Sequence, residues 1–583
     1  MIKKRTHTFR IIGAILGIIL LVMAGISLYI SLTYKKYIKE HLPEWVAKAS
    51  DSVYHVSIQD ISISLFTRQL TVTGIRLWPD TSCSNYHKET GSHHRIAVAI
   101  AIPKLEMKSI QWRKLISDKE LACGEVILSA PTAMIISRAR IVDSSRIMPE
   151  KKKDPAIKRI FASSIRIVAP NIAYKTYNKD DDSSVWTLKG GESVLNDWLL
   201  DPKVKDTTRF LLARSAVIDS AAFMFCKPSA LYRFQAAAVY FNSEKNLLTV
   251  NKLKVAPIVD KETFYKIVGH RITIWNASVR KLVFNDINWL GLMHNKTLIV
   301  SSINMDEPDV SLYFSYYPPH KPGSMVHADP TNMLRHLPLR VHVNEVAVSN
   351  AHISYTELSE KSQREGTLLF DHVSLHAHNI INIGSDIARN HVFKAEAKGK
   401  FMKTSNITAA YQVSLSDSLS PFIIEGEIKD MHASQIDPVA RALALISVDS
   451  GHVQEIKAHV HGNQNTMQCM LNILYTDLQA ELEKSDGGGK MHERTILTAI
   501  ANTFFVYHDN PINGKPPRTA NVTLPRDPEV AYFAGIVKTV KLGTKEIVER
   551  HEKVVAILTN DKDAKREYKK GFFNRLFGKK KKK

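Results

Sequence analysis

The chain contains little cysteine, glycine or proline, and it lacks the short motifs of common catalytic sites. Glycine and proline together make 48 of 583 residues, about 8%, which excludes a collagen-like or low-complexity protein. The sequence has no G-x-x-x-x-G-K-[ST] phosphate loop, no G-x-S-x-G nucleophile elbow and no H-E-x-x-H zinc motif. We therefore predict a protein that is not an enzyme, with no catalytic residue, no metal site and no cofactor.

The four cysteines are isolated along the chain, without a C-x-x-C pair or a zinc-like grouping. They are Cys83, Cys123, Cys226 and Cys469. Four cysteines can form two disulfides in three ways, or stay reduced. We favour buried single thiols for most of them, because cysteine packs as a small apolar side chain.

The 24 histidines raise the question of a metal site. On a strand, side chains at i and i+2 share a face, so His376 and His378, or His459 and His461, could each begin a metal site. The spacing supplies no third ligand for either pair. We therefore interpret these residues as histidines on a solvent-facing side of a sheet.

Acidic residues are outnumbered by basic ones, 57 to 79, which gives a net charge of +22. The excess is concentrated at the two ends: residues 1–10 carry +4, residues 565–583 carry +9, and all the others together carry +9. A nucleic-acid-binding surface normally has its basic residues on one face of a domain. The distribution therefore argues against a nucleic-acid partner.

One long uncharged run occupies residues 11–32. As a helix it would be about 33 Å long, enough to cross a hydrocarbon core of about 30 Å. A cleavable signal peptide is the alternative, but its apolar region is normally shorter and ends in a small-residue site. We predict a transmembrane anchor with residues 1–10 in the cytoplasm and the body exported.

After residue 54, apolar residues alternate with polar or small ones, which is typical of strands with one buried face. The positions expected to line that face are Ile61, Ile63, Leu65, Ile96, Val98, Ile100 and Ile102. The alternation recurs with a turn residue inside the motif, as at Pro131, Pro170, Pro308 and Asn350. Because proline interrupts a hydrogen-bond ladder, we interpret these positions as strand ends or turns of one long antiparallel sheet.

Two segments resemble the AsmA-like family, the superfamily that includes TamB and YhdP. Residues 56–77, directly after the single anchor, resemble the N-terminal signature of that family. Residues 422–482 resemble its C-terminal region through Ile424–Ile428, Ile446–Val453 and Tyr475–Leu478. The lysine-rich tail is not part of the shared pattern. The resemblance implies a bacterial inner-membrane protein with a β-rich periplasmic body.

The resemblance also implies a function. Family members take part in phospholipid transport between membranes and in outer-membrane homeostasis, through a long sheet curled into an apolar groove. The expected partners are a phospholipid or other acyl-chain lipid, the inner membrane and outer-membrane assembly proteins. From the residues alone, the apolar face could equally pack as a protein core. The alternative function is a β-rich scaffold that recruits assembly partners without lipid cargo.

The C-terminal tail interleaves aromatic and basic residues. Apolar side chains can enter the headgroup boundary of a membrane while lysine and arginine meet anionic lipid. The residues expected to contact a membrane surface are Phe572, Phe573, Arg575, Leu576, Phe577, Lys579 and Lys580. A disordered, solubilising end is the alternative.

The expected fold class is mainly β, a long repetitive antiparallel and curled sheet with one N-terminal transmembrane helix and a few C-terminal helices. The C-terminal helices are expected over 491–506 and 527–558, the latter interrupted near Gly543. The expected regions are a cytoplasmic segment (1–10), the anchor (11–32), a helical linker (33–53), the repetitive β body (54–420), the AsmA-like β region (421–486), a helical region (487–564) and the basic tail (565–583).

Overall fold

The structure is a computed structural model that describes residues 35–48, 50, 54–80, 96–138, 158–178, 182–201, 206, 208–321, 329–360, 362–482, 506–527, 529–530 and 532–549. Of these residues, 60% lie in strands and 18% in helices, so the expected β-rich class is confirmed. The chain divides into two compact units, and each is described by itself. The first contains residues up to 258 together with 281–296, and the second contains the rest.

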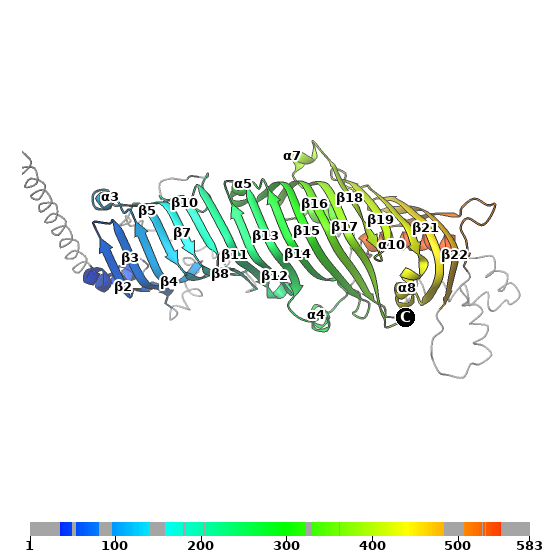
Figure 1. Ribbon diagram of the computed structural model, residues 1–583, viewed down its shortest axis with the longest axis horizontal. Coiled ribbons are helices and arrows are strands. Elements are labelled where there is room, and N and C mark those ends of the chain that lie inside the picture. The colour runs from blue at the N-terminus through cyan, green and yellow to red at the C-terminus, as the bar shows by residue number, and fades with distance from the viewer. Residues whose placement is uncertain are drawn as a thin grey trace, which may run out of the picture. The chain divides into compact units, whose positions relative to one another are not determined.

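The first unit consists of strands that lie side by side, shown from blue to teal in Figure 1. Its strands are β1 (Tyr54–Ser57), β2 (Asp60–Ser64), β3 (Gln69–Pro79), β4 (Ile96–Lys108), β5 (Glu120–Ser129), β6 (Thr132–Arg138), β7 (Arg159–Val168), β8 (Asn171–Tyr177), β9 (Ser183–Lys189), β10 (Glu192–Leu200), β11 (Ser215–Lys227), β12 (Tyr232–Asn242) and β13 (Leu247–Pro257). Strand β14 (Ile274–Asn285) contributes residues to both units. The helical elements are a helix over 35–48, α3 (Trp112–Ser117), η2 (Pro228–Ala230) and α5 (Trp289–Asn295).

The second unit has longer strands and more helices. Its strands are β15 (Thr297–Ser315), β16 (Arg340–Leu358), β17 (Glu365–Ile381), β18 (Val392–Phe401), β19 (Ser405–Ser414), β20 (Phe422–His432), β21 (Ile446–Gly462), β22 (Thr466–Leu482) and β23 (Thr519–Pro525). Its helical elements are α4 (Lys261–Val268), α6 (Pro330–Arg335), α7 (Gly384–Ile387), η4 (Ala433–Ile436), α8 (Asp437–Ala444) and α10 (Tyr532–Val548).

The expectation of a purely antiparallel sheet is wrong. Strand pairs β5–β7, β6–β8 and β15–β16 run parallel, whereas the other strand pairs described in each unit are antiparallel. Parallel neighbours need a long connection that returns the chain to the same end of the sheet. The connection from Ser315 to Arg340 is one of these, and it contains α6.

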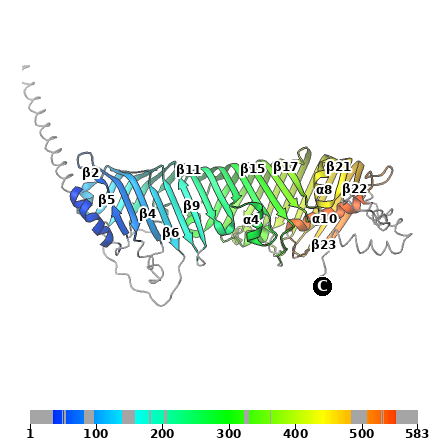
Figure 2. The ribbon, with the colours of Figure 1, turned by 90° about the horizontal axis from the view of Figure 1, so that it is seen from below.

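Left-handed residues interrupt the long strands at matching levels in adjacent strands. In the first unit, the Ala130 N–H donates to the carbonyl of Val168. The N–H of Ala169, which follows Val168 in the chain, donates to the carbonyl of Gly191. Ala130 and Ala169 have φ of 45° and 49°, and Gly191 has φ of 68°. Because a left-handed residue departs from the extended conformation, it bends each strand where it crosses this line. Figure 2 shows the strands of the first unit from below.

The same line of bulges occurs in the second unit. Glu307, Asn350 and His372 have φ of about 50°, and Asn350 Oδ1 lies 2.7 Å from His372 Nδ1. The pairing of β16 with β17 shifts register at this level. We expected Pro131, Pro170, Pro308 and Asn350 to mark strand ends or turns. Pro131 lies between β5 and β6, and Pro170 lies between β7 and β8, so the expectation is confirmed for these two prolines. It is wrong for Pro308 and Asn350, which lie inside β15 and β16. A proline is tolerated inside a strand where the hydrogen-bond ladder is locally interrupted.

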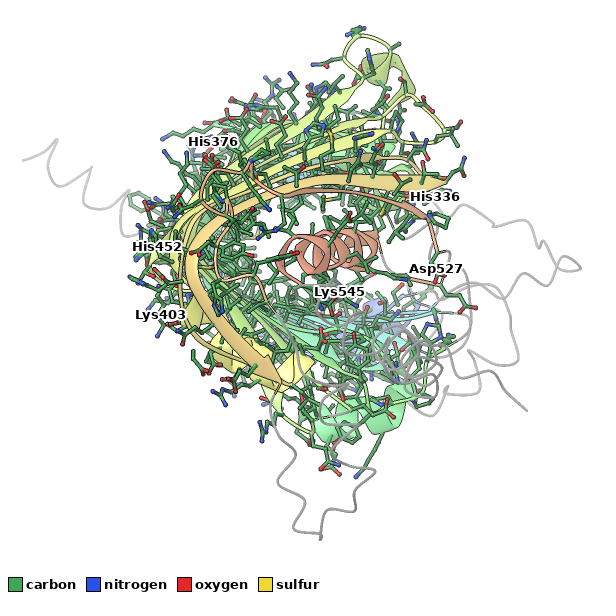
Figure 3. The ribbon with its side chains drawn as sticks, turned by 90° about the vertical axis from the view of Figure 1, so that its right-hand side faces the viewer. His336, His376, Lys403, His452, Asp527 and Lys545 are labelled. Carbon is green, nitrogen blue, oxygen red and sulfur yellow. The ribbon has the colours of Figure 1, made fainter. Side chains whose placement is uncertain are left out.

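The main hydrophobic core belongs to the second unit, where β21 and β22 curve around α10 (Figure 3). Its most buried side chains include Val460, Leu471 and Tyr475, and α10 contributes Ile536 and Ile547. We expected a break near Gly543, but α10 is continuous through it. Gly543 packs so closely on Leu471 that an added Cβ would lie 3.1 Å from Leu471 Cδ2. Tertiary packing thus overrides the weak helix propensity of glycine.

Several expected elements lie outside the described residues. These are the anchor at 11–32, the helix over 491–506 except for its last residue, and the basic tail at 565–583. In the part of the chain that the structure describes, no helix is long and apolar enough to cross a bilayer.

The three described cysteines are free thiols. Cys123 and Cys469 are buried, and burial raises the pKa of each thiol to about 11. Cys226 is half-buried. At pH 8 about one in a thousand of the buried thiols is ionised, and the thiolate is the nucleophile. We expect iodoacetamide to alkylate Cys226 in the native protein and to leave Cys123 and Cys469 unmodified until urea is added. Peptide mass spectrometry measures this, and rapid native modification of Cys123 would contradict the burial.

Candidate functional site

The sequence-predicted lining residues lie on β2 and β4, at one end of the first unit. Ile61 and Ile63 of β2 pair with Val72 and Leu70 of β3. On β4, Ile102 pairs with Ile75, and Ile100 pairs with Leu77. Directly paired residues share a face of an antiparallel sheet, so these aliphatic side chains form cross-strand pairs.

Three of the predicted residues are at the margins of this arrangement. Val98 pairs with Ile135 of β6, and Ile96, the first residue of β4, pairs with Ser137. Leu65 lies in the turn that follows β2 rather than in a strand. The predicted set is therefore brought together on β2 and β4, except for Leu65.

The apolar positions change their phase by one residue at each bulge. On β3 they are Leu70 and Val72 before Gly74 and Ile75 and Leu77 after it. Side chains alternate between the two faces of a strand, so a one-residue change of phase would normally move them to the other face. Gly74 has φ of 62°, and this left-handed residue compensates for the change of phase, while β3 keeps the same register with β4 on both sides of it. The apolar side chains thus stay on one side as the strand bends.

The apolar face extends over more strands than the sequence prediction included. Val126 of β5 pairs with Met107 of β4 and with Ile165 of β7, and Ile165 pairs with Leu195 of β10. Of these side chains only Met107 is buried; the others are half-buried. Val126 and Ile165 pack against a small buried cluster that contains Met107 and Cys123.

The opposite face of the same strands carries charged pairs. Lys108 Nζ lies 2.9 Å from Glu125 Oε2, Arg166 Nε lies 3.4 Å from Glu125 Oε1, and Arg166 Nη1 lies 3.3 Å from Glu192 Oε1. This row crosses β4, β5, β7 and β10 and is partly exposed. The sheet of the first unit therefore has one charged, solvated face and one apolar face.

A row of aromatic side chains continues the apolar face and was missed by the sequence analysis. The ring of Trp186 lies 4.3 Å from that of Phe225 and 5.5 Å from that of Phe223, and Phe225 lies 5.7 Å from Phe234, measured between centroids. Trp186 is 43% exposed and Phe234 is 37% exposed. The alternation of Phe223 and Phe225 was a signal, but only strand register joins the three strands involved.

A hollow of about 560 Å³ opens mainly on the other side of the same strands. Its lining includes Trp78, Ala99 and Met134, and Ala99 pairs with Met134 on the side opposite Ile100. Leu77, Ile100 and Ala133 contribute to its lining from the apolar face. The hollow is therefore not an extension of the predicted lining.

In the second unit, α10 covers one face of β22. Cys469, Leu471 and Tyr475 of β22 are less than 3% exposed beneath α10 and neighbouring residues. Here the alternative of a packed core holds.

The histidine pairs do not gather into a metal site. His376 Nδ1 lies 3.5 Å from a Glu345 oxygen, and His459 Nδ1 lies 3.4 Å from a Glu425 oxygen. Across the residues that the structure describes, no group of three His, Cys, Asp or Glu side chains is arranged to hold a metal ion.

Comparison with known proteins adds no relative: no family model matches the chain, and no curated protein matches it. The AsmA-like resemblance rests on residues 56–77 and 422–482.

Proposed function

We propose that this is a non-enzymatic, AsmA-like envelope protein that carries or shields phospholipids between membranes and so supports outer-membrane homeostasis. The observation that carries the proposal is the half-buried apolar face of the first unit. That face runs from Ile100 on β4 to Phe234 on β12, and the charged row lies on the opposite side of the sheet. A water-soluble sheet normally covers such a face, and a large open apolar surface indicates a binding partner.

An acyl chain fits this surface physically. It would gain about 0.8 kcal/mol for each CH₂ group moved from water onto the apolar side chains. The rows of Ile, Val, Leu and aromatic side chains offer no fixed polar group that would demand a particular headgroup. The same surface can therefore accept successive positions of a lipid along the sheet.

The proposed location follows from the ends of the chain. Residues 11–32 would anchor the protein in the inner membrane with the body in the periplasm. Residues 572–580 would contact an anionic membrane surface through Phe572, Phe573, Leu576 and Phe577 and the neighbouring cations. Both segments lie outside the described residues.

The test is to purify the full-length protein in mild detergent and analyse it by native mass spectrometry and lipid extraction. We expect phospholipid to remain bound after detergent exchange, in amounts comparable to the protein. A lipid-free protein, even after incubation with phospholipid vesicles, would overturn the proposal. That result would favour the β-rich scaffold that recruits outer-membrane assembly partners.

A further inference from the structure

Helix α10 is fixed to the sheet by one of its faces. Tyr532, Ile536, Thr539, Gly543 and Ile547 are its buried residues, and they follow one another at intervals of three or four. This spacing places them on one side of a helix. Figure 3 shows α10 on the inner side of the curved strands. The opposite side of α10 is therefore the surface that the second unit presents at this place.

That opposite side has two adjoining stripes. Phe533 is 58% exposed and Val537 is 50% exposed, and at i and i+4 they form an apolar stripe. Lys538, Lys541 and Lys545 follow at intervals of three and four and form a cationic stripe beside it. Such a division between apolar and basic stripes is typical of helices that meet anionic lipid.

Two of the lysines have no carboxylate partner in the part of the chain that the structure describes. Lys545 Nζ lies 3.5 Å from Glu549. Lys538 and Lys541 have no carboxylate within 4.0 Å among the described residues. Lys541 is exposed and Lys538 is half-buried. Their charges stand next to two large exposed apolar side chains, so a complementary ligand has a negative group attached to an apolar chain.

We propose that this face of α10 binds an anionic phospholipid carried by the protein, with its phosphate at Lys538 and Lys541 and an acyl chain on Phe533 and Val537. The inference rests on the proposed lipid-carrying function and adds headgroup selection to it. The aliphatic and aromatic rows of the first unit accept any acyl chain, whereas α10 favours lipids with a net negative headgroup.

The test compares wild type with the K538Q/K541Q variant. The control is K394Q/K398Q, which removes the same charge from β18. Both lysines are exposed, and Lys394 pairs with the exposed residue His378 of β17, so the change lies on a solvent-facing side of the sheet. Each full-length protein is incubated with dodecylmaltoside micelles that contain equal amounts of phosphatidylglycerol and phosphatidylethanolamine. The protein is then repurified, and its bound lipids are quantified by mass spectrometry. Melting temperatures check that all variants are folded.

We expect wild type and control to be enriched in phosphatidylglycerol. In K538Q/K541Q the ratio of phosphatidylglycerol to phosphatidylethanolamine should fall by about fivefold per lysine, with total bound lipid little changed. An unchanged ratio with lipid still bound would overturn the selection by α10 and leave the proposed function intact. Absence of both lipids from wild type would overturn the proposed function and this inference with it.

Discussion

The I100D variant is expected to lose at least nine-tenths of its bound phospholipid while remaining folded. Ile100 is a half-buried residue of β4, paired with Leu77 on one side and Ala133 on the other. A carboxylate at this point would have to be desolvated beneath an acyl chain, at a cost of about 2–4 kcal/mol, which exceeds a tenfold loss of affinity. Without lipid the same carboxylate stays in water, so the free energy of unfolding should change by less than about 1 kcal/mol.

The matched control is A99D, which places the same charge on the neighbouring residue. Ala99 pairs with Met134, a 45% exposed side chain on the other face of the sheet. A99D should keep its lipid. The measurement is bound phospholipid per protein by mass spectrometry, with urea denaturation as the check on folding. Two results would speak against an open lipid face: equal lipid in both variants, or a loss of stability of several kcal/mol in I100D alone, as expected for a buried core position.

The amphipathic character of the sheet could be predicted from the sequence because it depends on local alternation. The spacing of Ile61 and Ile63, and of Val98, Ile100 and Ile102, placed aliphatic side chains on one face, and the pairing of β2, β3 and β4 agrees with this. The aromatic row could not be predicted in the same way. Trp186, Phe225 and Phe234 come from three strands, and only long-range register brings their rings together.

Two of the bends were misinterpreted for a related reason. Pro308 lacks an amide hydrogen, so locally it indicates the end of a strand. Strand β15 continues past Pro308 because its parallel partner β16 keeps the same register on both sides of it, and β16 likewise continues through Asn350. The clue in the sequence was the change of phase in the apolar positions, from Ile303 and Met305 to Val310 and Leu312.

The G191A variant is expected to be strongly destabilised, because Gly191 occupies the tightest point of the bend in the first unit. A Cβ on Gly191 would lie 2.1 Å from the carbonyl oxygen of Asp219 and 2.8 Å from the amide nitrogen of Ala221. These are backbone atoms of β11, so no side-chain rotation can relieve the clash. The positive φ of Gly191, +68°, adds a conformational cost of about 1–2 kcal/mol for any residue with a Cβ. We expect a total loss of about 3–5 kcal/mol in the free energy of unfolding.

Gly190 supplies the control for this prediction. Its φ is +70°, almost the same as that of Gly191, but a Cβ on Gly190 would meet nothing within 4 Å. The G190A variant should therefore lose only the conformational cost of about 1–2 kcal/mol. Urea denaturation of both full-length variants measures the difference, which isolates the close approach of the two strands at the bulge. Equal losses in G190A and G191A would mean that the strands are farther apart than this bend requires, and the apolar face that depends on the bend would then be flatter. Because I100D tests the lining of that face and G191A tests the bend that shapes it, the two variants probe independent requirements for holding a lipid.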